Sequence, residues 1–291
     1  DLLLGADDED VLFGGAGDTW ETARQLAVQM ATGGTSEPNV DPSLRIELEQ
    51  LARVAELQVT QATGLDTGGI DVVPVTRAQW ADAAIRSYRP IFEKLTGALT
   101  ESQAPPLDPA QTGDPMAAMF GQIMQMIGPM MRGMTAGSMV GHLASRSLGQ
   151  YDVPIPRLET RDITVIPANI EAFGDEWSLP LQDLLLWICL HEICHEAVLG
   201  VPHIGATLQR MLLDYAGGVR TDPGALEDRL AGLDLSNPEA FGQLQETRGD
   251  PEVVLGAIQS PEQQALLPDL HALTAVVVGY VDHTMDAIGG S

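Results

Sequence analysis

The segment LQDLLLWICLHEICHEAVLG, residues 181–200, is apolar around nearly its whole circumference when it is placed on a helix. A helix of this kind has to be buried on all sides, so the chain must build its core around it. Ser178 is a typical N-cap residue and Pro180 is tolerated in a first turn. Gly200 follows the apolar run, where a helix commonly ends. We therefore expect a buried helix over residues 179 to 199.

Two histidines lie four residues apart on this helix, with a glutamate between them. At about 100° per residue, His191 and His195 lie about 40° apart on one face, and Glu192 stands beside them. This is the H-E-x-x-H pattern, in which the histidines bind zinc and the glutamate acts as general base. The metal lowers the pKa of its bound water, and Glu192 would take the proton and return it to the leaving amine. A chance match is the alternative, but a buried His-Glu-His group is costly unless a metal or partners satisfy it.

A catalytic zinc site needs a third protein ligand. His203 lies eight residues after His195, whereas the long zincin signature places its third histidine six residues after the second. The last apolar stretch, HALTAVVVGYVDHTMDAIGG at residues 271–290, contains Asp282 and His283 as polar intruders. We expect Zn²⁺ to lie between the two helices, with Asp282 as the third ligand and His283 as the alternative.

Net charge and cysteine content indicate which partners are unlikely and in which cellular compartment the protein functions. The chain has 41 acidic against 15 basic residues, a formal net charge of −26, and it is 44% hydrophobic. Its negative field disfavours nucleic acid and makes an anionic membrane surface an unlikely partner. Cys189 and Cys194 lie five apart on one helix and would make a poor disulfide. Because the N-terminal residues also lack a basic n-region, we expect a cytoplasmic protein.

The remaining chain is mostly helical, which predicts a mainly α fold with a small β-sheet. Apolar spacings of three and four predict helices at 20–31, 42–64 (with Asp41 as N-cap), 76–99, 204–216 and 268–288, with shorter pieces between 223 and 259. The clearest strand signal is DITVIPANI, residues 162–170, where β-branched residues run up to a proline that should end or edge a sheet. Since zincins commonly bind an extended peptide along a sheet edge, the backbone near Ala168 and the amide of Asn169 are candidate substrate-binding groups. The alternative is that Asn169 caps the turn after the strand.

Three regions follow from the breaks in these patterns. Residues 1–18 form an acidic lead that we expect to be flexible, 19–112 a helical N-terminal region, and 113–291 a region with the H-E-x-x-H helix. The last two regions could form one compact unit. A Met/Gly-rich segment at 116–141 repeats glycine at Gly133, Gly137 and Gly141. This spacing favours a closely packed, buried helix pair over a membrane span, and a partner-binding surface is the alternative.

Four blocks carry a resemblance to a known family: SLGQYDVPIPR, ITVIPANIEAF, LLLWICLHEICHEAVLGVPHI and VVGYVDHTMD. They resemble uncharacterised bacterial zincin-like hydrolases associated by name with deazaflavin-coenzyme biosynthesis. The resemblance implies a mostly helical zincin-like fold, with His191, Glu192 and His195 carried over. The chain departs from the family at Val278-Gly279, where the family usually reads Glu-Gly and the glutamate would be the third ligand.

Two functions follow from these patterns. The first is a zinc-dependent hydrolase that cleaves a peptide or amide bond, with Glu192 as general base. The second is a degenerate zincin that acts as a non-catalytic metal-binding, scaffold or regulatory protein. The departure at Val278 keeps both open, because two histidines alone leave a zinc site incomplete.

Overall fold

The computed structural model describes residues 16–102, 133–157, 160–220 and 260–290. Within these ranges the named elements are the helices and strands α1 (Ala16–Thr32), α2 (Pro42–Thr63), β1 (Val72–Pro74), α3 (Arg77–Ser102), β2 (Ile163–Val165), α6 (Pro167–Trp177), α7 (Leu181–Leu199), α8 (Pro202–Gly217) and α12 (Pro261–Gly289). The predicted fold class, mainly α with a small β-sheet, is confirmed.

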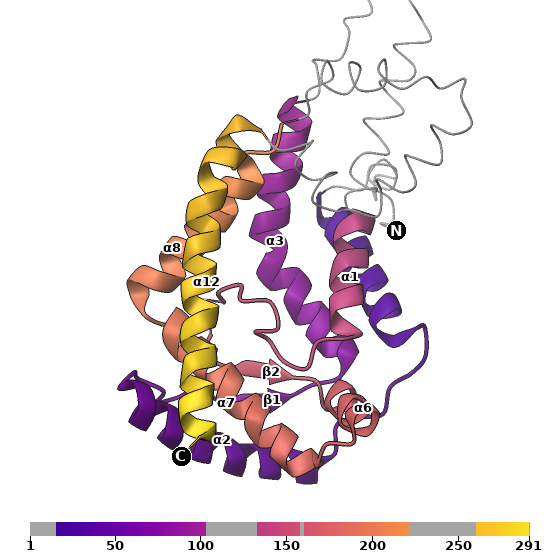
Figure 1. Cartoon of the computed structure of the whole chain (residues 1–291). Coiled ribbons are helices and arrows are strands. Elements are labelled where there is room, and N and C mark those ends of the chain that lie inside the picture. The colour runs from indigo at the N-terminus through magenta and orange to yellow at the C-terminus, as the bar shows by residue number, and fades with distance from the viewer. Residues whose placement is uncertain (1–15, 103–132, 158–159, 221–259, 291) are drawn as a thin grey trace, which may run out of the picture.

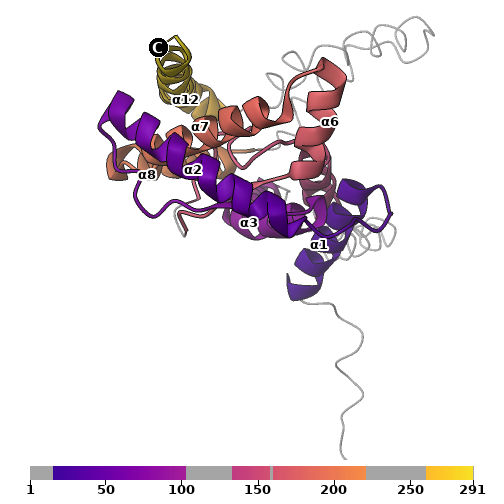
Figure 2. The ribbon, with the colours of Figure 1, turned by 90° about the horizontal axis from the view of Figure 1, so that it is seen from below.

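Helix α7 lies at the centre of the main core. Helix α2 crosses beneath it, α12 packs against it, and α8 leaves its C-terminal end at an 88° bend to pack on α12 and α3 (Figures 1 and 2). Thirteen of the 19 residues of α7 are buried, as its apolar circumference predicts. The core around it draws on α2, both strands, α7, α8 and α12. The H-E-x-x-H residues are therefore fixed by the most deeply packed helix that the structure describes.

The two strands form a short parallel sheet in which Val72 pairs with Ile163. The predicted strand at 162–170 is too long, because α6 begins at Pro167, directly after β2. Proline is well suited to a first helical position, where its missing N–H is not needed. Ala168 and Asn169 consequently lie in the first turn of a helix, beyond the end of the strand.

Two helix starts also differ from their predictions. Ser178 is the left-handed residue (φ 55°) that ends α6, and the N-cap of α7 is Pro180. Helix α12 begins at Pro261, seven residues before the predicted start, because Ser260 and Gln263 form a reciprocal capping box. Pro268 lies inside this helix. The predicted cap at Asp41 is confirmed, since its carboxylate accepts a hydrogen bond from the N–H of Ser43 at 2.8 Å.

The glycine repeat brings two helices into close contact. Residues 133–144 are helical and pack against α1. A Cβ atom at Gly137 would lie 2.5 Å from the backbone oxygen of Ala23, and one at Gly141 would lie 2.8 Å from that of Ala27. The expected close packing is therefore present at these glycines, with α1 as the partner.

Several predictions fall outside the described residues: most of the acidic lead, the Met/Gly-rich residues 116–132 and the helical pieces at 223–259. The division into regions stays a prediction. In the described part of the chain, α12 is long and apolar enough to cross a membrane, and the pair α7 and α8 would also qualify if its 88° bend were a break in one span. Length and composition alone are weak evidence, since core helices of soluble proteins have the same properties.

Candidate active site

A cavity of about 700 Å³ opens beside α7 and is bounded by α6, α12 and the loop that follows residue 147. Its wall includes the side chains of His191 and His195, and it also includes Val278 of α12. A pocket of this size accommodates a large organic group. The two histidines of the motif therefore face a space that a substrate could enter.

His195 is held in the form that can bind a metal. It is 2% exposed, and its Nδ1 lies 3.1 Å from the backbone oxygen of His191. Burial first, and then the neighbouring His191, lower the pKa of His195 to about 4. The ring is neutral near pH 7, so Nδ1 donates to the carbonyl and Nε2 is left as the acceptor nitrogen.

His191 completes the pair of imidazoles. Its ring stacks on Trp187 at a centroid distance of 5.1 Å and lies 4.4 Å from the ring of His195. Its Nδ1 is 3.3 Å from Oε1 of Glu192. A carboxylate beside Nδ1 fixes the tautomer of a histidine and directs Nε2 away from it. Both rings can therefore present Nε2 as the free nitrogen.

Glu192 is buried, and a backbone loop holds its carboxylate. The side chain is 1% exposed, and its Oε2 accepts hydrogen bonds from the N–H groups of Gln150 (2.8 Å) and Tyr151 (2.9 Å). The preceding Gly149 lies so close that a Cβ there would come 2.5 Å from the carboxyl carbon of Glu192. Glu192 is absent from the cavity lining among the described residues, so its contact with the cavity runs through His191.

The side chain that α12 places on the cavity wall beside the two histidines is apolar and cannot bind a metal. Val278 lines the cavity together with both histidines, whereas the side chains of Asp282 and His283 are exposed and neither lines it. Across the described parts of the chain, no group of three or more His, Cys, Asp or Glu residues is placed to hold a metal ion. The structure thus unites His191, Glu192 and His195 but does not bring the predicted third ligand to them.

Asp152 is a polar residue of the cavity that the sequence patterns did not single out. Its Oδ2 accepts a hydrogen bond from the N–H of Leu148 at 2.6 Å, and burial raises the pKa of its carboxyl group. The signal for this residue was its place in the block Gly149-Gln-Tyr-Asp152. That block forms the loop that holds Glu192, so Asp152 reaches the cavity from the same turn.

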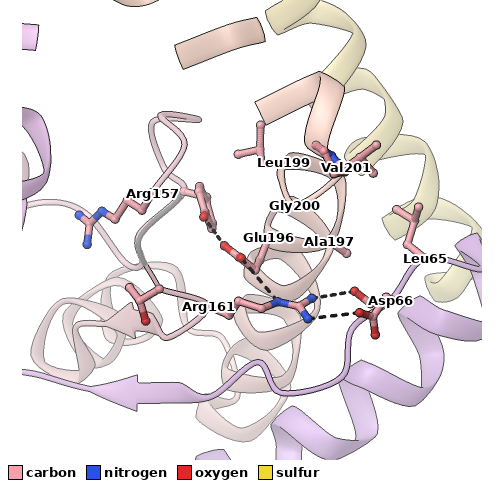
Figure 3. A pocket seen from close by; sticks show the side chains of 12 residues that line it. Leu65, Asp66, Arg157, Arg161, Glu196, Ala197, Leu199, Gly200 and Val201 are labelled. Carbon is pink, nitrogen blue, oxygen red and sulfur yellow. Dashed lines mark hydrogen bonds and ion pairs between the residues drawn. The ribbon is translucent and has the colours of Figure 1, made fainter. Parts of the chain in front are cut away.

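A second cavity, of about 470 Å³, lies on the other side of Tyr151 and contains Glu196 (Figure 3). The Tyr151 hydroxyl donates a short hydrogen bond to Glu196, whose Oε1 lies 4.0 Å from Nε of Arg161. Arg161 also donates to the backbone oxygen of Asp66 at 2.8 Å. Burial raises the pKa of Glu196. Tyr151 lines both cavities, and its ring stacks on that of His195 at a centroid distance of 5.7 Å. The hydrogen bond to Glu196 therefore helps to hold the ring that packs against His195.

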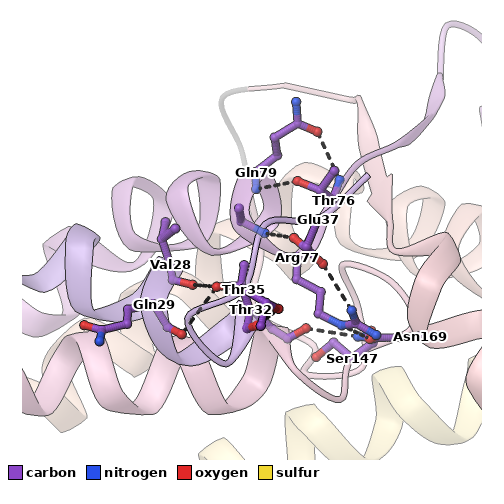
Figure 4. Close-up of polar contacts among 12 residues, drawn as sticks. Val28, Gln29, Thr32, Thr35, Glu37, Thr76, Arg77, Gln79, Ser147 and Asn169 are labelled. Carbon is purple, nitrogen blue, oxygen red and sulfur yellow. Dashed lines mark hydrogen bonds and ion pairs between the residues drawn. The ribbon is translucent and has the colours of Figure 1, made fainter. Parts of the chain in front are cut away.

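Asn169 has its hydrogen-bonding groups inside the protein (Figure 4). It is 5% exposed; its Nδ2 donates to the backbone oxygens of Ala144 and Ser147, and its Oδ1 accepts from Nε of Arg77 at 2.5 Å. Neither Asn169 nor Ala168 lines the cavity in the described structure. These contacts tie α6 to α3 and to the loop before Gly149.

Comparisons with known proteins show what the chain resembles as a whole. The chain is similar to the crystal structure of a protein from Chloroflexus aurantiacus that is described as a putative hydrolase with a novel fold. The two share 19% identity with a TM-score of 0.59, over 93% of this chain and 69% of the other, so the likeness concerns the fold alone. No curated protein matches the chain. A family model described as zincin-like metallopeptidase matches residues 19–291, and the chain therefore belongs to this family.

Proposed function

We propose that this chain is a metal-dependent hydrolase that cleaves a peptide or amide bond, with Glu192 as general base. Membership of the zincin-like metallopeptidase family supports hydrolysis, and zinc is the usual metal of such proteins. The observation that carries the proposal is the pair of adjacent imidazoles at the wall of a 700 Å³ cavity, with the Glu192 carboxylate 3.3 Å from one of them.

The residues present fit two of the three ligand positions of a catalytic zinc site. His191 and His195 would hold the metal through Nε2, because Nδ1 of each ring faces a hydrogen-bond acceptor. Asp282 or His283 as third ligand stays a prediction, and it would require α12 to turn or slide, since both side chains are exposed. A bound divalent metal would supply a polarised carbonyl and a water of lowered pKa.

The chain's own groups have separate parts in this proposal. Glu192 would accept the proton from the attacking water and return it to the leaving amine. This role requires its Oε1, which lies 3.3 Å from Nδ1 of His191, to turn toward the water at the cavity wall. The N–H groups of Gln150 and Tyr151 hold its carboxylate in place, which removes the entropy cost of orienting it. The large cavity binds the part of the substrate next to the scissile bond.

Metal analysis of untagged protein, purified without added metal and without chelator, tests this proposal. We expect about one zinc per chain in the wild type and none in a His191→Ala, His195→Ala double variant. The matched control is His203→Ala, His271→Ala, because these two histidines are exposed and lie outside the cavity. Zinc retained by the site variant would refute the ligand assignment.

A second candidate function is ligand binding by a zincin-like fold without hydrolysis. The observation that favours it is Val278, which places a hydrocarbon side chain at the cavity wall shared by the two histidines. A wild-type protein that carries no zinc, and that takes up none in the micromolar range, would support this second function and count against the first.

A further inference from the structure

The large cavity is apolar over most of its wall. Nine of its 13 lining residues are Leu, Val, Pro, Phe, Tyr or Trp, among them Leu148, Pro154, Phe173, Leu184, Trp187 and Val278. Its volume of about 700 Å³ exceeds what a metal ion and a water need. The space beside the histidines is therefore shaped for a large apolar group of the substrate.

The charged groups of the cavity are all acidic. Asp152 and Asp183 line it, and no lysine or arginine does so in the described structure. The whole chain adds a formal net charge of −26. Negative walls and a negative overall field raise the free energy of a bound anion and lower that of a bound cation. Free fatty acids and acidic peptides are poor occupants for this reason.

The acidic, aromatic and histidine side chains of the cavity lie in a row along α7, and their spacing determines which part of a bound substrate each one can contact. Asp183, Trp187 and His191 follow one another at intervals of four residues, and all three line the cavity. At about 1.5 Å per residue, Asp183 lies about 12 Å along the helix from His191, and Trp187 lies midway. An extended peptide spans this length with about three to four residues.

We propose that the substrate of this site is a peptide with a large apolar side chain next to the scissile bond and a basic residue about three positions farther along. This inference rests on the proposed function. The apolar side chain packs on Trp187, and the basic residue pairs with Asp183. The carbonyl to be cleaved then lies beside His191 and His195.

Binding to metal-free protein tests the inference without hydrolysis. Three labelled peptides of equal length are compared by fluorescence anisotropy in the presence of a chelator: one with leucine and lysine at the two positions, one with alanine and lysine, and one with leucine and glutamate. Burial of a leucine side chain is worth about 1.5–3 kcal/mol, so we expect the first peptide to bind about ten- to hundredfold more tightly than the alanine peptide. The glutamate peptide and dodecanoate should bind more weakly than the first peptide.

Two variants with matched controls locate the contacts. Trp187→Ala should weaken binding of the leucine-lysine peptide, whereas Trp177→Ala should not, because Trp177 is 64% exposed and does not line the cavity. Asp183→Asn should reduce the preference for lysine over glutamate, whereas Asp175→Asn on α6 should leave it unchanged. Asp183 is exposed in the first turn of α7, so its variant tests the charge preference even if Trp187→Ala fails to fold.

The inference is overturned if the three peptides bind equally, or if dodecanoate binds as tightly as the leucine-lysine peptide. It is separable from the proposed function. The expected peptide preference in a protein that never binds zinc would keep the binding site and refute the hydrolase. Zinc binding and peptide cleavage without the preference would keep the hydrolase and refute this substrate class.

Discussion

Gly149 lies directly against the carboxylate of Glu192, so that a methyl group at residue 149 would come 2.5 Å from the carboxyl carbon and 2.6 Å from Oε1. The next two backbone N–H groups, those of Gln150 and Tyr151, donate to the other carboxylate oxygen. The absence of a side chain at Gly149 is therefore what allows the loop to reach the glutamate of the motif.

We expect Gly149→Ala to destabilise the protein and to displace Glu192. A methyl group forced into this contact costs about 1–3 kcal/mol of unfolding free energy, which urea denaturation would measure. Gly279→Ala is the matched control: nothing lies within 4 Å of the added atom, and alanine is favoured over glycine inside α12. Equal stability of the wild type and Gly149→Ala would refute the close approach.

Asn169→Ala should lower stability and leave peptide binding intact once the protein is folded. The substitution leaves two buried backbone oxygens and Nε of Arg77 without their partner, and each unsatisfied group costs about 1–3 kcal/mol. Thermal unfolding checks this prediction, with Asn39→Ala as the control because Asn39 is exposed. A fully stable variant with weakened peptide binding would instead give Asn169 the substrate-binding role.

Val278→Glu should raise the affinity of the site for zinc. A glutamate at this position adds a carboxylate to the cavity wall shared by His191 and His195 and would complete a three-ligand set, so we expect an affinity gain of about tenfold or more. Competition with a chromogenic chelator measures the change. Val276→Glu, on a side chain that is 65% exposed, should have no effect. Equal zinc affinities of the two variants would show that residue 278 does not face the metal.

Asp282→Ala and His283→Ala decide whether α12 moves to supply a ligand. Because both side chains are exposed and lie outside the cavity, we expect zinc affinity to stay within about twofold of the wild type if α12 keeps its position. The usual loss for a partner of a metal ligand is about 10- to 100-fold, and a ligand costs more. A loss of that size in either variant would show that the substituted residue takes part in zinc binding, and it would imply a shift of α12.

The sequence predicts those helices whose position along the chain depends only on the local hydrophobic pattern and on a capping residue. The apolar circumference of residues 181–199 correctly predicts the buried α7, and the cap at Asp41 predicts the start of α2. Ile163 and Val165 favour a strand and form β2, but the sequence patterns do not predict α6, which Pro167 starts directly after the strand. Proline suits the first position of a helix, so Pro167 both ends the strand signal and begins α6.

The site was predictable only where its residues share one helix. The four-residue spacing places His191 and His195 on one face whatever the rest of the chain does. The loop that holds Glu192 uses backbone N–H groups, which have no residue-type signature beyond the need for Gly149. The position of α12 relative to α7 depends on packing between distant segments. Helical periodicity could place Asp282 near the face of Val278, but it could not show which turn reaches the histidines.

The most direct test of the central claim compares wild type and Glu192→Gln on a peptide library, with cleavage products identified by mass spectrometry and zinc content measured on the same samples. We expect Glu192→Gln to keep the zinc of the wild type and to cleave the same bonds at a rate lower by a factor of about 10² or more, the usual contribution of a positioned general base. Cleavage by Glu192→Gln at the wild-type rate would contradict the role of Glu192, and zinc-loaded wild type that cleaves no peptide would contradict the hydrolase itself.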